Sequence, residues 1–390
     1  MDTDRATGYM YELVQLMLNK KGFEIFITAG SSPAIKVGEE LQRVGEVTLT
    51  PSQTEILAQS IMNDRQQKAF DAEKECNFTL NYPNIARLRV SVFRQRGSVG
   101  MVMRLINPYV PDFEELHLPP IMQKLAMAKR GLVIFIGATG CGKSTSMASM
   151  IEYRNTNTSE HIVTIEEPIE YYFRHKKCLV DQREIGVDTE SYEDALKHTM
   201  RQSPNVVVIG EMRERESLKH AIAFAETGHL CLTTLHAHNT EQAFERMINM
   251  YPHDRRDQLL MDLSMNMLAF IAQRLVKRAD GPGLVPAVEV LLPTPRVTDL
   301  VLKGQLGEIK DAMMRSGEVG MKTFDQALFE LYEEGKISHD TALRNADSEN
   351  AVRLKIKLES KRELPDDLKG KGDNFQIETH PDDDRSSQWM

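Results

Sequence analysis

The sequence of 390 residues contains few cysteines and no long apolar run. The four cysteines are Cys76, Cys141, Cys178 and Cys231. None lies in a CxxC pair, so the sequence predicts neither a zinc site nor a disulfide framework. The longest apolar-rich stretch, residues 259–276, is interrupted by polar and charged side chains. It therefore falls short of the roughly 18 apolar residues that span a bilayer.

The amino-terminal segment lacks the basic start and apolar core of a secretory signal, since MDTDRATG carries two aspartates. An excess of basic residues is missing too, because 57 acidic and 48 basic residues give a net charge of −9. This balance argues against a general nucleic-acid binder, which usually carries a basic surface. We therefore expect a cytoplasmic protein without a transmembrane segment, which binds no nucleic acid and reaches a membrane through a partner.

The first 110 residues predict a small α+β domain. Apolar residues at helical spacing near the start are followed by an apolar strand and a Gly-Ser-Pro turn. A later strand pair alternates buried-type side chains with arginines, as half-buried strands do. Four prolines then predict a linker. The expected segments are a helix around 13–17, a strand at 24–28, a turn at 29–33, a strand pair within 85–105 and a linker at 111–130.

From residue 131 to 347 the pattern changes to short, wholly apolar strands that alternate with amphipathic helices. Such strands suit a parallel sheet covered on both faces by helices, which predicts an α/β domain. After about residue 254 we expect mainly helices, and from 348 to 390 a charged, disordered tail. The expected strands are residues 132–136, 161–165, 206–209 and 230–235, and the expected helices lie around 192–200 and 218–225.

The strongest motif is a complete phosphate-binding loop, G-x-x-x-x-G-K-[ST]. It follows an apolar strand and opens a helix, which is the setting that this motif requires. Backbone amides and the helix amino terminus would bind the phosphates, with Lys143 at the β- and γ-phosphates. Ser144 would bind Mg²⁺, and Thr145 is expected near the α-phosphate. The loop consists of Gly137, Ala138, Thr139, Gly140, Cys141, Gly142, Lys143, Ser144 and Thr145.

Hydrolysis also needs a residue that orients water and an acid beside the metal ion. Three carboxylates, Glu166, Glu167 and Glu170, follow the second strand. Glu211 ends the third strand, as in a Walker B motif with glutamate in place of aspartate. The alternatives are a solvated acidic loop for the first group and a helix-starting acid for Glu211.

Histidines border the fourth strand. His229 precedes it, and His236 and His238 follow it. A zinc pair is conceivable for the last two, but a third ligand at the usual spacing is missing from the sequence. A role in sensing the γ-phosphate or in contacts between subunits fits better.

Arginines in the small domain could supply the positive charge that phosphoryl transfer requires. They are Arg87, Arg89, Arg94, Arg96 and Arg104. The alternative is a solvated basic face. If some of them reach a nucleotide, they would contribute about 10³–10⁵ in rate.

Four ordered motifs together resemble the secretion ATPase superfamily, in its type IV pilus retraction branch, the PilT/PilU family. The resemblance covers about residues 5–345. GATGCGKST matches the family's Walker A motif, and TIEEPIE matches its acidic box with Glu167 in place of aspartate. Gly210-Glu211-Met212-Arg213 matches its Walker B motif, and the segments around His229 and His236 match its histidine box.

The resemblance implies a RecA-like ATPase domain after a PAS-like α+β domain, in a homohexameric ring that uses ATP and Mg²⁺. Glu170 would be the general base and Glu211 the acid beside the metal ion. His229 and His236 would sense phosphate or couple its loss to movement. The family's paired arginines match Arg89 and Arg104. The ring would act in the cytoplasm on the pilus platform protein at the inner membrane, powering pilus retraction and twitching motility.

Two departures favour the accessory, PilU-like members, which work with a PilT-type retraction ATPase. The retraction motif A-I-R of PilT-like members falls at Arg296-Val297-Thr298 here, and a charged tail extends beyond the family's usual end. Three other functions stay open: a pilus-assembly or type II secretion ATPase, a DNA-linked RecA-type ATPase and a nucleotide-binding regulator. The first usually carries a four-cysteine zinc insertion, which the cysteine spacing here does not match.

Overall fold

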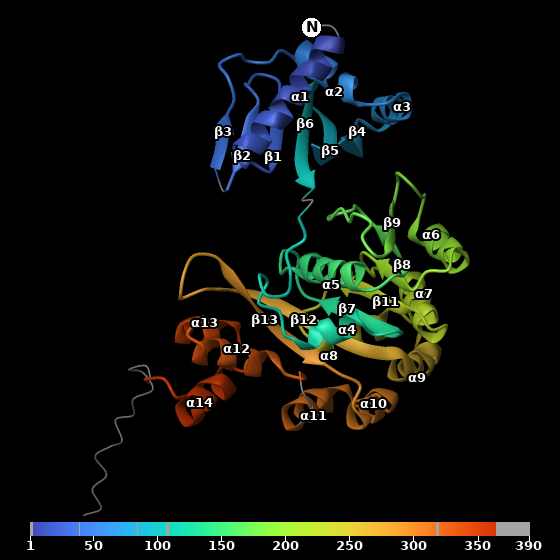
Figure 1. The fold of residues 1–390 in the computed structure, drawn as a ribbon, viewed down its shortest axis with the longest axis vertical. Helices are drawn as coiled ribbons and strands as arrows, with labels where there is room; N and C mark the ends of the chain where they lie inside the picture. Colours follow the sequence, from blue (N-terminus) through green and yellow to red (C-terminus); the bar gives the residue numbers. More distant parts are fainter. Residues whose placement is uncertain (1–2, 39, 84, 107–108, 317–319, 364–390) are drawn as a thin grey trace, which may run out of the picture. The chain divides into compact units, whose positions relative to one another are not determined.

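The structure is a computed structural model that describes residues 3–38, 40–83, 85–106, 109–316 and 320–363 (Figure 1). The chain forms two compact units. The larger unit runs to Arg274 and resumes over Val288–Lys322. The smaller one combines Leu275–Ala287 with the chain from Thr323 onward.

The amino-terminal part is the predicted small α+β domain. Its six strands form one antiparallel sheet in the order β3-β2-β1-β6-β5-β4, and three helices accompany it. The elements are α1 (Thr3–Asn19), β1 (Glu24–Thr28), β2 (Ala34–Val37), β3 (Glu40–Arg43), α2 (Pro51–Ile61), α3 (Asp64–Glu73), β4 (Glu75–Tyr82), β5 (Ala86–Gln95) and β6 (Ser98–Ile106).

Local sequence explains these elements. Thr50 and Asn63 each close a capping box at the start of α2 and α3, which satisfies amide groups that a helix leaves unpaired. Leu88, Val90 and Val92 on β5 are fully buried, whereas Arg89 between them is exposed. The predicted alternation of this strand is therefore confirmed.

The second part is the predicted α/β domain, built on a seven-stranded sheet in the order β13-β12-β7-β11-β10-β8-β9. The strands from β12 to β9 in this order run parallel. The elements are α4 (Ile121–Ala126), β7 (Gly131–Ile136), α5 (Lys143–Asn157), β8 (His161–Glu166), β9 (Leu179–Glu184), α6 (Tyr192–Thr199), β10 (Val206–Ile209), α7 (Arg215–Glu226), β11 (Leu230–Leu235), α8 (Thr240–Asn249), α9 (Arg256–Asn266), β12 (Met267–Lys277), β13 (Leu284–Leu291), α10 (Pro295–Leu302) and α11 (Ile309–Arg315).

All four predicted strands of this sheet are confirmed as β7, β8, β10 and β11. Every residue of β7, β10 and β11 is buried, as expected for strands covered on both faces. Helices form most of the described chain after residue 254, as expected, but the sequence did not predict β12 and β13, which complete the sheet. β12 follows α9 directly and pairs with β7.

The linker predicted over 111–130 instead contributes to the core of this domain. Phe113, Leu118 and Met122 are buried in the same apolar cluster as Phe135 of β7 and Met150 of α5. This proline-rich segment is therefore packed into the domain and is not a linker, because its apolar side chains are buried in the core.

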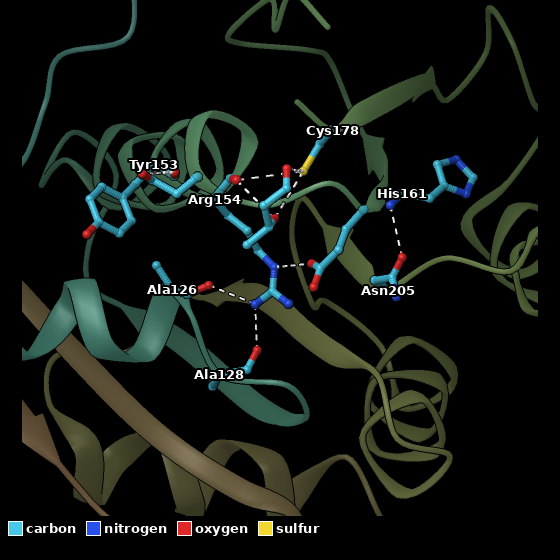
Figure 2. A network of polar contacts seen from close by, with 10 residues as sticks. Ala126, Ala128, Tyr153, Arg154, His161, Cys178 and Asn205 are labelled. Carbon is cyan, nitrogen blue, oxygen red and sulfur yellow. Dashed lines mark hydrogen bonds and ion pairs between the residues drawn. The ribbon is translucent and has the colours of Figure 1, made fainter. Parts of the chain in front are cut away.

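Arg154 of α5 binds the segment 111–130 through hydrogen bonds to its backbone (Figure 2). Its side chain is buried, and its guanidinium donates to the carbonyl oxygens of Ala126 (2.8 Å) and Ala128. Its Nε donates to Glu160 Oε2 at 2.6 Å. The carbonyl of Arg154 also accepts from Cys178 Sγ. The carboxyl-terminal end of α5 therefore contacts both the chain before β7 and the chain before β9.

The described residues of the smaller unit form three helices, and the last of them contradicts the disorder predicted from residue 348. α12 opens with a capping box at Thr323. Val352 and Ile356 of α14 are buried, so this charged helix is amphipathic. The rest of the predicted tail, 364–390, lies outside the described residues. The helices are α12 (Phe324–Glu333), α13 (His339–Asn345) and α14 (Glu349–Glu359).

Within the described part of the chain, no helix combines the length and apolar character needed to cross a membrane.

Candidate functional site

The site lies where β7, β11, β10 and β8 end, at one edge of the parallel sheet. Ile136 of β7 pairs with Leu235 of β11, and Ile209 of β10 pairs with Ile165 of β8. The chain segments that follow these four strands therefore emerge side by side. They carry the phosphate-binding loop, the acidic segment, Glu211 and His236.

The conformation of the phosphate-binding loop depends on its glycines. Gly140 and Gly142 adopt left-handed conformations, with φ of 80° and 90°. Gly137 is packed so closely that an added Cβ would lie 2.3 Å from Cys141 Sγ and 2.8 Å from the Gln273 carbonyl oxygen. The motif residues thus form the compact turn that the sequence predicted.

Lys143 at the start of α5 is buried beneath this turn. Its Nζ donates to the carbonyl oxygens of Gly137 (2.8 Å) and Ala138 (2.9 Å). Burial lowers the pKa of Lys143, while Cys141, Glu211 and Glu170 act in the opposite direction. Burial thus disfavours the charged form of this lysine, and the acids of the site favour it.

Gln273 of β12 supports the loop from the neighbouring strand. Its Nε2 donates to the Cys141 carbonyl at 2.8 Å, and its Oε1 accepts from Ser146 Oγ at 2.8 Å. The side chain is buried. In the sequence this glutamine was only a polar interruption of an apolar stretch, and its role as a support was missed.

Thr145 contacts the loop that follows the acidic segment. Its hydroxyl lies 2.8 Å from the hydroxyl of Tyr171. Ser144 precedes it on the first turn of α5, partly exposed. Tyr171 was not among the predicted site residues, because a tyrosine after an acidic segment carries no motif of its own.

Glu211 is held between two basic side chains. Arg213 Nε donates to Glu211 Oε2 at 2.8 Å, and His236 Nε2 lies 3.1 Å from Glu211 Oε1. Arg213 also pairs with Glu167 at 3.1 Å. Arg213 is exposed, yet it bridges two acids of the site, which the sequence did not reveal.

His236 is the histidine that the structure places beside this acid. Burial and the nearby charge of Lys143 lower the pKa of His236, and Glu211 opposes that shift. The neutral imidazole is therefore favoured at neutral pH.

Glu166 and Glu170 occupy different environments. Glu166 is partly buried, and its carboxylate accepts from Thr164 Oγ1 (2.6 Å), Gln182 Nε2 (3.3 Å) and the backbone N–H of Glu170. Burial outweighs these donors and raises the pKa of Glu166 to about 7. Glu170 is exposed, and its charge acts on Lys143. The acidic segment is thus more than a solvated loop.

Tyr192 at the start of α6 closes the space between the acidic strand ends. Burial raises the pKa of Tyr192, and the charge of Glu167 acts in the same direction. A Cβ on Gly210 would lie 3.3 Å from the Tyr192 hydroxyl and 3.2 Å from the Cα of Glu166. The glycine before Glu211 therefore permits a tight approach of β10 to β8.

His229 lies at the other end of β11. Its backbone carbonyl accepts from Gly131 N–H at the start of β7, and its ring contacts the Phe224 carbonyl. Six residues of strand, about 20 Å, separate it from His236. The structure therefore does not bring His229 to the phosphate-binding loop of its own chain.

The zinc site considered for His236 and His238 would need a third ligand. Among the described residues, no group of three or more His, Cys, Asp or Glu side chains could hold a metal ion. His238 is exposed.

Arg89 on β5 and Arg104 on β6 lie opposite each other on neighbouring strands of the small domain. Their Cα atoms are partners in the β5–β6 register, and both side chains are exposed. Arg104 Nε also donates to buried Glu24 at 2.7 Å. Their contact with a nucleotide stays a prediction.

Oxygen ligands suited to Mg²⁺ are available at this edge. Mg²⁺ prefers hard oxygen donors and is usually held by few protein ligands together with substrate phosphates. The Glu211 carboxylate and the Ser144 hydroxyl are donors of this kind, so the residues fit the ion.

Comparisons with known proteins show which proteins this chain resembles. The sequence profile of the family described as "Type II/IV secretion system protein" matches residues 48–288. The type IV pilus ATPase PilU of Pseudomonas aeruginosa is 51% identical over 372 residues, 95% of this chain and 97% of that protein. The type IV pilus retraction ATPase PilT of the same organism is 35% identical over 86% of this chain and 97% of that protein. The crystal structure of the pilus retraction motor PilT with bound ADP matches with a TM-score of 0.82 and 35% identity, over 87% of this chain and 97% of that chain.

Proposed function

The chain belongs to the type II/IV secretion system protein family, in its PilT/PilU branch of type IV pilus ATPases, and we propose that it is a PilU-like accessory motor. In this role it hydrolyses ATP and contributes to pilus retraction beside a PilT-type motor. The greater identity to PilU than to PilT, over almost the whole chain, supports the accessory assignment. So does the sequence Arg296-Val297-Thr298 in place of the A-I-R motif.

One observation carries the catalytic assignment: the segments that hold Glu170 and Glu211 follow β8 and β10 at the same sheet edge as the complete phosphate-binding loop that follows β7. Lys143 and the loop amides would hold the phosphates and balance their charge. Glu170, exposed in the segment that follows β8, would accept a proton from the attacking water. Glu211 and Ser144 would hold Mg²⁺, which neutralises charge on the β- and γ-phosphates when it is bound.

His236 would report the state of the γ-phosphate to Glu211, which it contacts. Arg89 and Arg104 would complete the site from the small domain. His229, at the far end of β11, would act at a contact between subunits. These roles assume the homohexameric ring of the family, and the ring would act on the platform protein of the pilus at the inner membrane.

A direct test measures ATP turnover and nucleotide binding with purified protein. Wild type should hydrolyse ATP only with Mg²⁺, and Glu170→Gln should bind nucleotide within threefold of wild type while turnover falls by at least 100-fold. Glu190→Gln, at an exposed position near the end of β9, is the matched control and should keep wild-type turnover. Wild-type turnover in Glu170→Gln would reject the base, and turnover stimulated by DNA would favour a nucleic-acid motor.

The accessory role is tested in cells that carry type IV pili. Overproduction of the wild-type chain should increase retraction only where a PilT-type motor is present. Retraction that persists undiminished after deletion of that motor would refute the accessory role without affecting the ATPase assignment.

A further inference from the structure

The loop that carries Glu170 has no regular secondary structure of its own. It connects β8 to β9, and residues 167–170 are classed as neither helix nor strand. A catalytic base must be held within a fraction of an ångström of its working position. Other side chains must therefore fix this loop.

Gln182 on β9 contacts the loop backbone on both sides of Tyr172. Its Nε2 donates to the Tyr171 carbonyl at 2.8 Å, and its Oε1 accepts from the Phe173 N–H at 2.8 Å. One primary amide thus satisfies a donor and an acceptor of the same loop. The next residue on this face of β9, Glu184, adds a longer bond of 3.4 Å from Ile169 N–H.

The same amide reaches the start of the loop. Gln182 Nε2 donates to Glu166 Oε1 at 3.3 Å, so the amide also holds the residue at which the loop begins. Gln182 pairs in register with Thr164 on β8, whose hydroxyl also donates to Glu166. Both ends of the segment from Glu166 to Phe173 therefore depend on Gln182.

The loop between β8 and β9 also contacts the phosphate-binding loop. Tyr171, whose carbonyl Gln182 holds, has its hydroxyl 2.8 Å from Thr145. Tyr171, which follows Glu170, is thus held by Gln182 through its carbonyl and by Thr145 on the first turn of α5 through its hydroxyl.

From these contacts we propose that Gln182 is a positioning residue for Glu170. In this role it acts by holding the backbone that carries the base. The inference rests on the proposed role of Glu170. It predicts that loss of the amide lowers the rate of hydrolysis and leaves nucleotide affinity unchanged.

The test compares Gln182→Met, which keeps the length of the side chain and removes both polar atoms, with Gln305→Met at an exposed position. We expect Gln182→Met to lower kcat by about 10- to 100-fold. ADP affinity should stay within threefold, and Gln305→Met should match wild type. If Gln182→Met fails to fold, Gln182→Glu, which keeps the acceptor for Phe173 and loses the donor, should show the same fall in kcat.

Single-turnover rates in a Glu170→Gln background separate positioning from general damage. Adding Gln182→Met to Glu170→Gln should slow hydrolysis by less than twofold, because the base is already absent. A further tenfold loss there would overturn the inference, as would a kcat within twofold of wild type in Gln182→Met alone. Full turnover in Glu170→Gln alone would instead reject the proposed base.

Discussion

Glu211 and His236 are in contact at the ends of neighbouring strands, with 3.1 Å between Oε1 and Nε2. Glu211 follows β10 and His236 follows β11, and these two strands pair in parallel. The contact joins the acid proposed for the metal ion to the histidine proposed to sense phosphate. It also places the charge of Lys143 close to the imidazole.

Replacing His236 by glutamine should lower ATP turnover by at least tenfold. The amide keeps a polar contact with Glu211 but cannot take up a proton as an imidazole does. Steady-state hydrolysis measures kcat, and ADP titration should show affinity within threefold of wild type. His238→Gln, exposed two residues later, is the control and should retain turnover within twofold. Equal losses in both variants would contradict a specific role for His236.

Gly137→Ala should weaken nucleotide binding by at least tenfold. The new Cβ would lie 2.8 Å from the Gln273 carbonyl oxygen, and that backbone atom can move only if β12 moves with it. Overpacking of this kind typically costs about 1–3 kcal/mol. Calorimetric titration with ADP gives the affinity. Gly281→Ala, where an added Cβ meets nothing within 4 Å, should bind as wild type does.

The sequence predicted the elements whose signals are local. The strand before the phosphate-binding loop, the loop glycines and the helix after it lie within one short segment, so their pattern suffices. Parallel pairing then explains why the segments that carry Glu170, Glu211 and His236 lie at one edge of the sheet, because residues that follow neighbouring parallel strands share that edge. The same topology separates His229, which precedes its strand.

Features that depend on distant contacts were missed. β12 follows α9 without a turn residue between Asn266 and Met267, so nothing in the local sequence marks the change. α4 lies among prolines, and only its burial against the sheet shows that it belongs to the core. Gln182 and Gln273 are single polar residues whose partners lie far away in sequence, and no spacing rule could identify them.

Arg154→Met should lower the free energy of unfolding by about 1–3 kcal/mol, because it leaves backbone carbonyls and a half-buried carboxylate without their donor. The change leaves Glu160 and the carbonyls of Ala126 and Ala128 without their donor (Figure 2). Urea unfolding followed by circular dichroism gives the difference. Arg174→Met, at an exposed position, should change stability by less than about 0.5 kcal/mol. A loss below 1 kcal/mol in Arg154→Met would show that the contacts contribute little.

Glu166→Gln should flatten the pH dependence of stability between pH 5 and pH 8. Burial raises the pKa of Glu166 to about 7 in the folded protein, above the value of 4.5 for an unperturbed glutamate. Protons bind more tightly to the folded state, so this group stabilises the protein at low pH, and the contribution is lost as the pH rises through about 7. Between pH 5 and pH 8, the free energy of unfolding of wild type should therefore fall by up to about 2–3 kcal/mol more than that of the variant. Urea unfolding at several pH values measures both curves, and Glu190→Gln should follow wild type. Parallel curves for wild type and Glu166→Gln would mean that the carboxyl titrates alike in the folded and unfolded states, and that its three donors fully offset its burial.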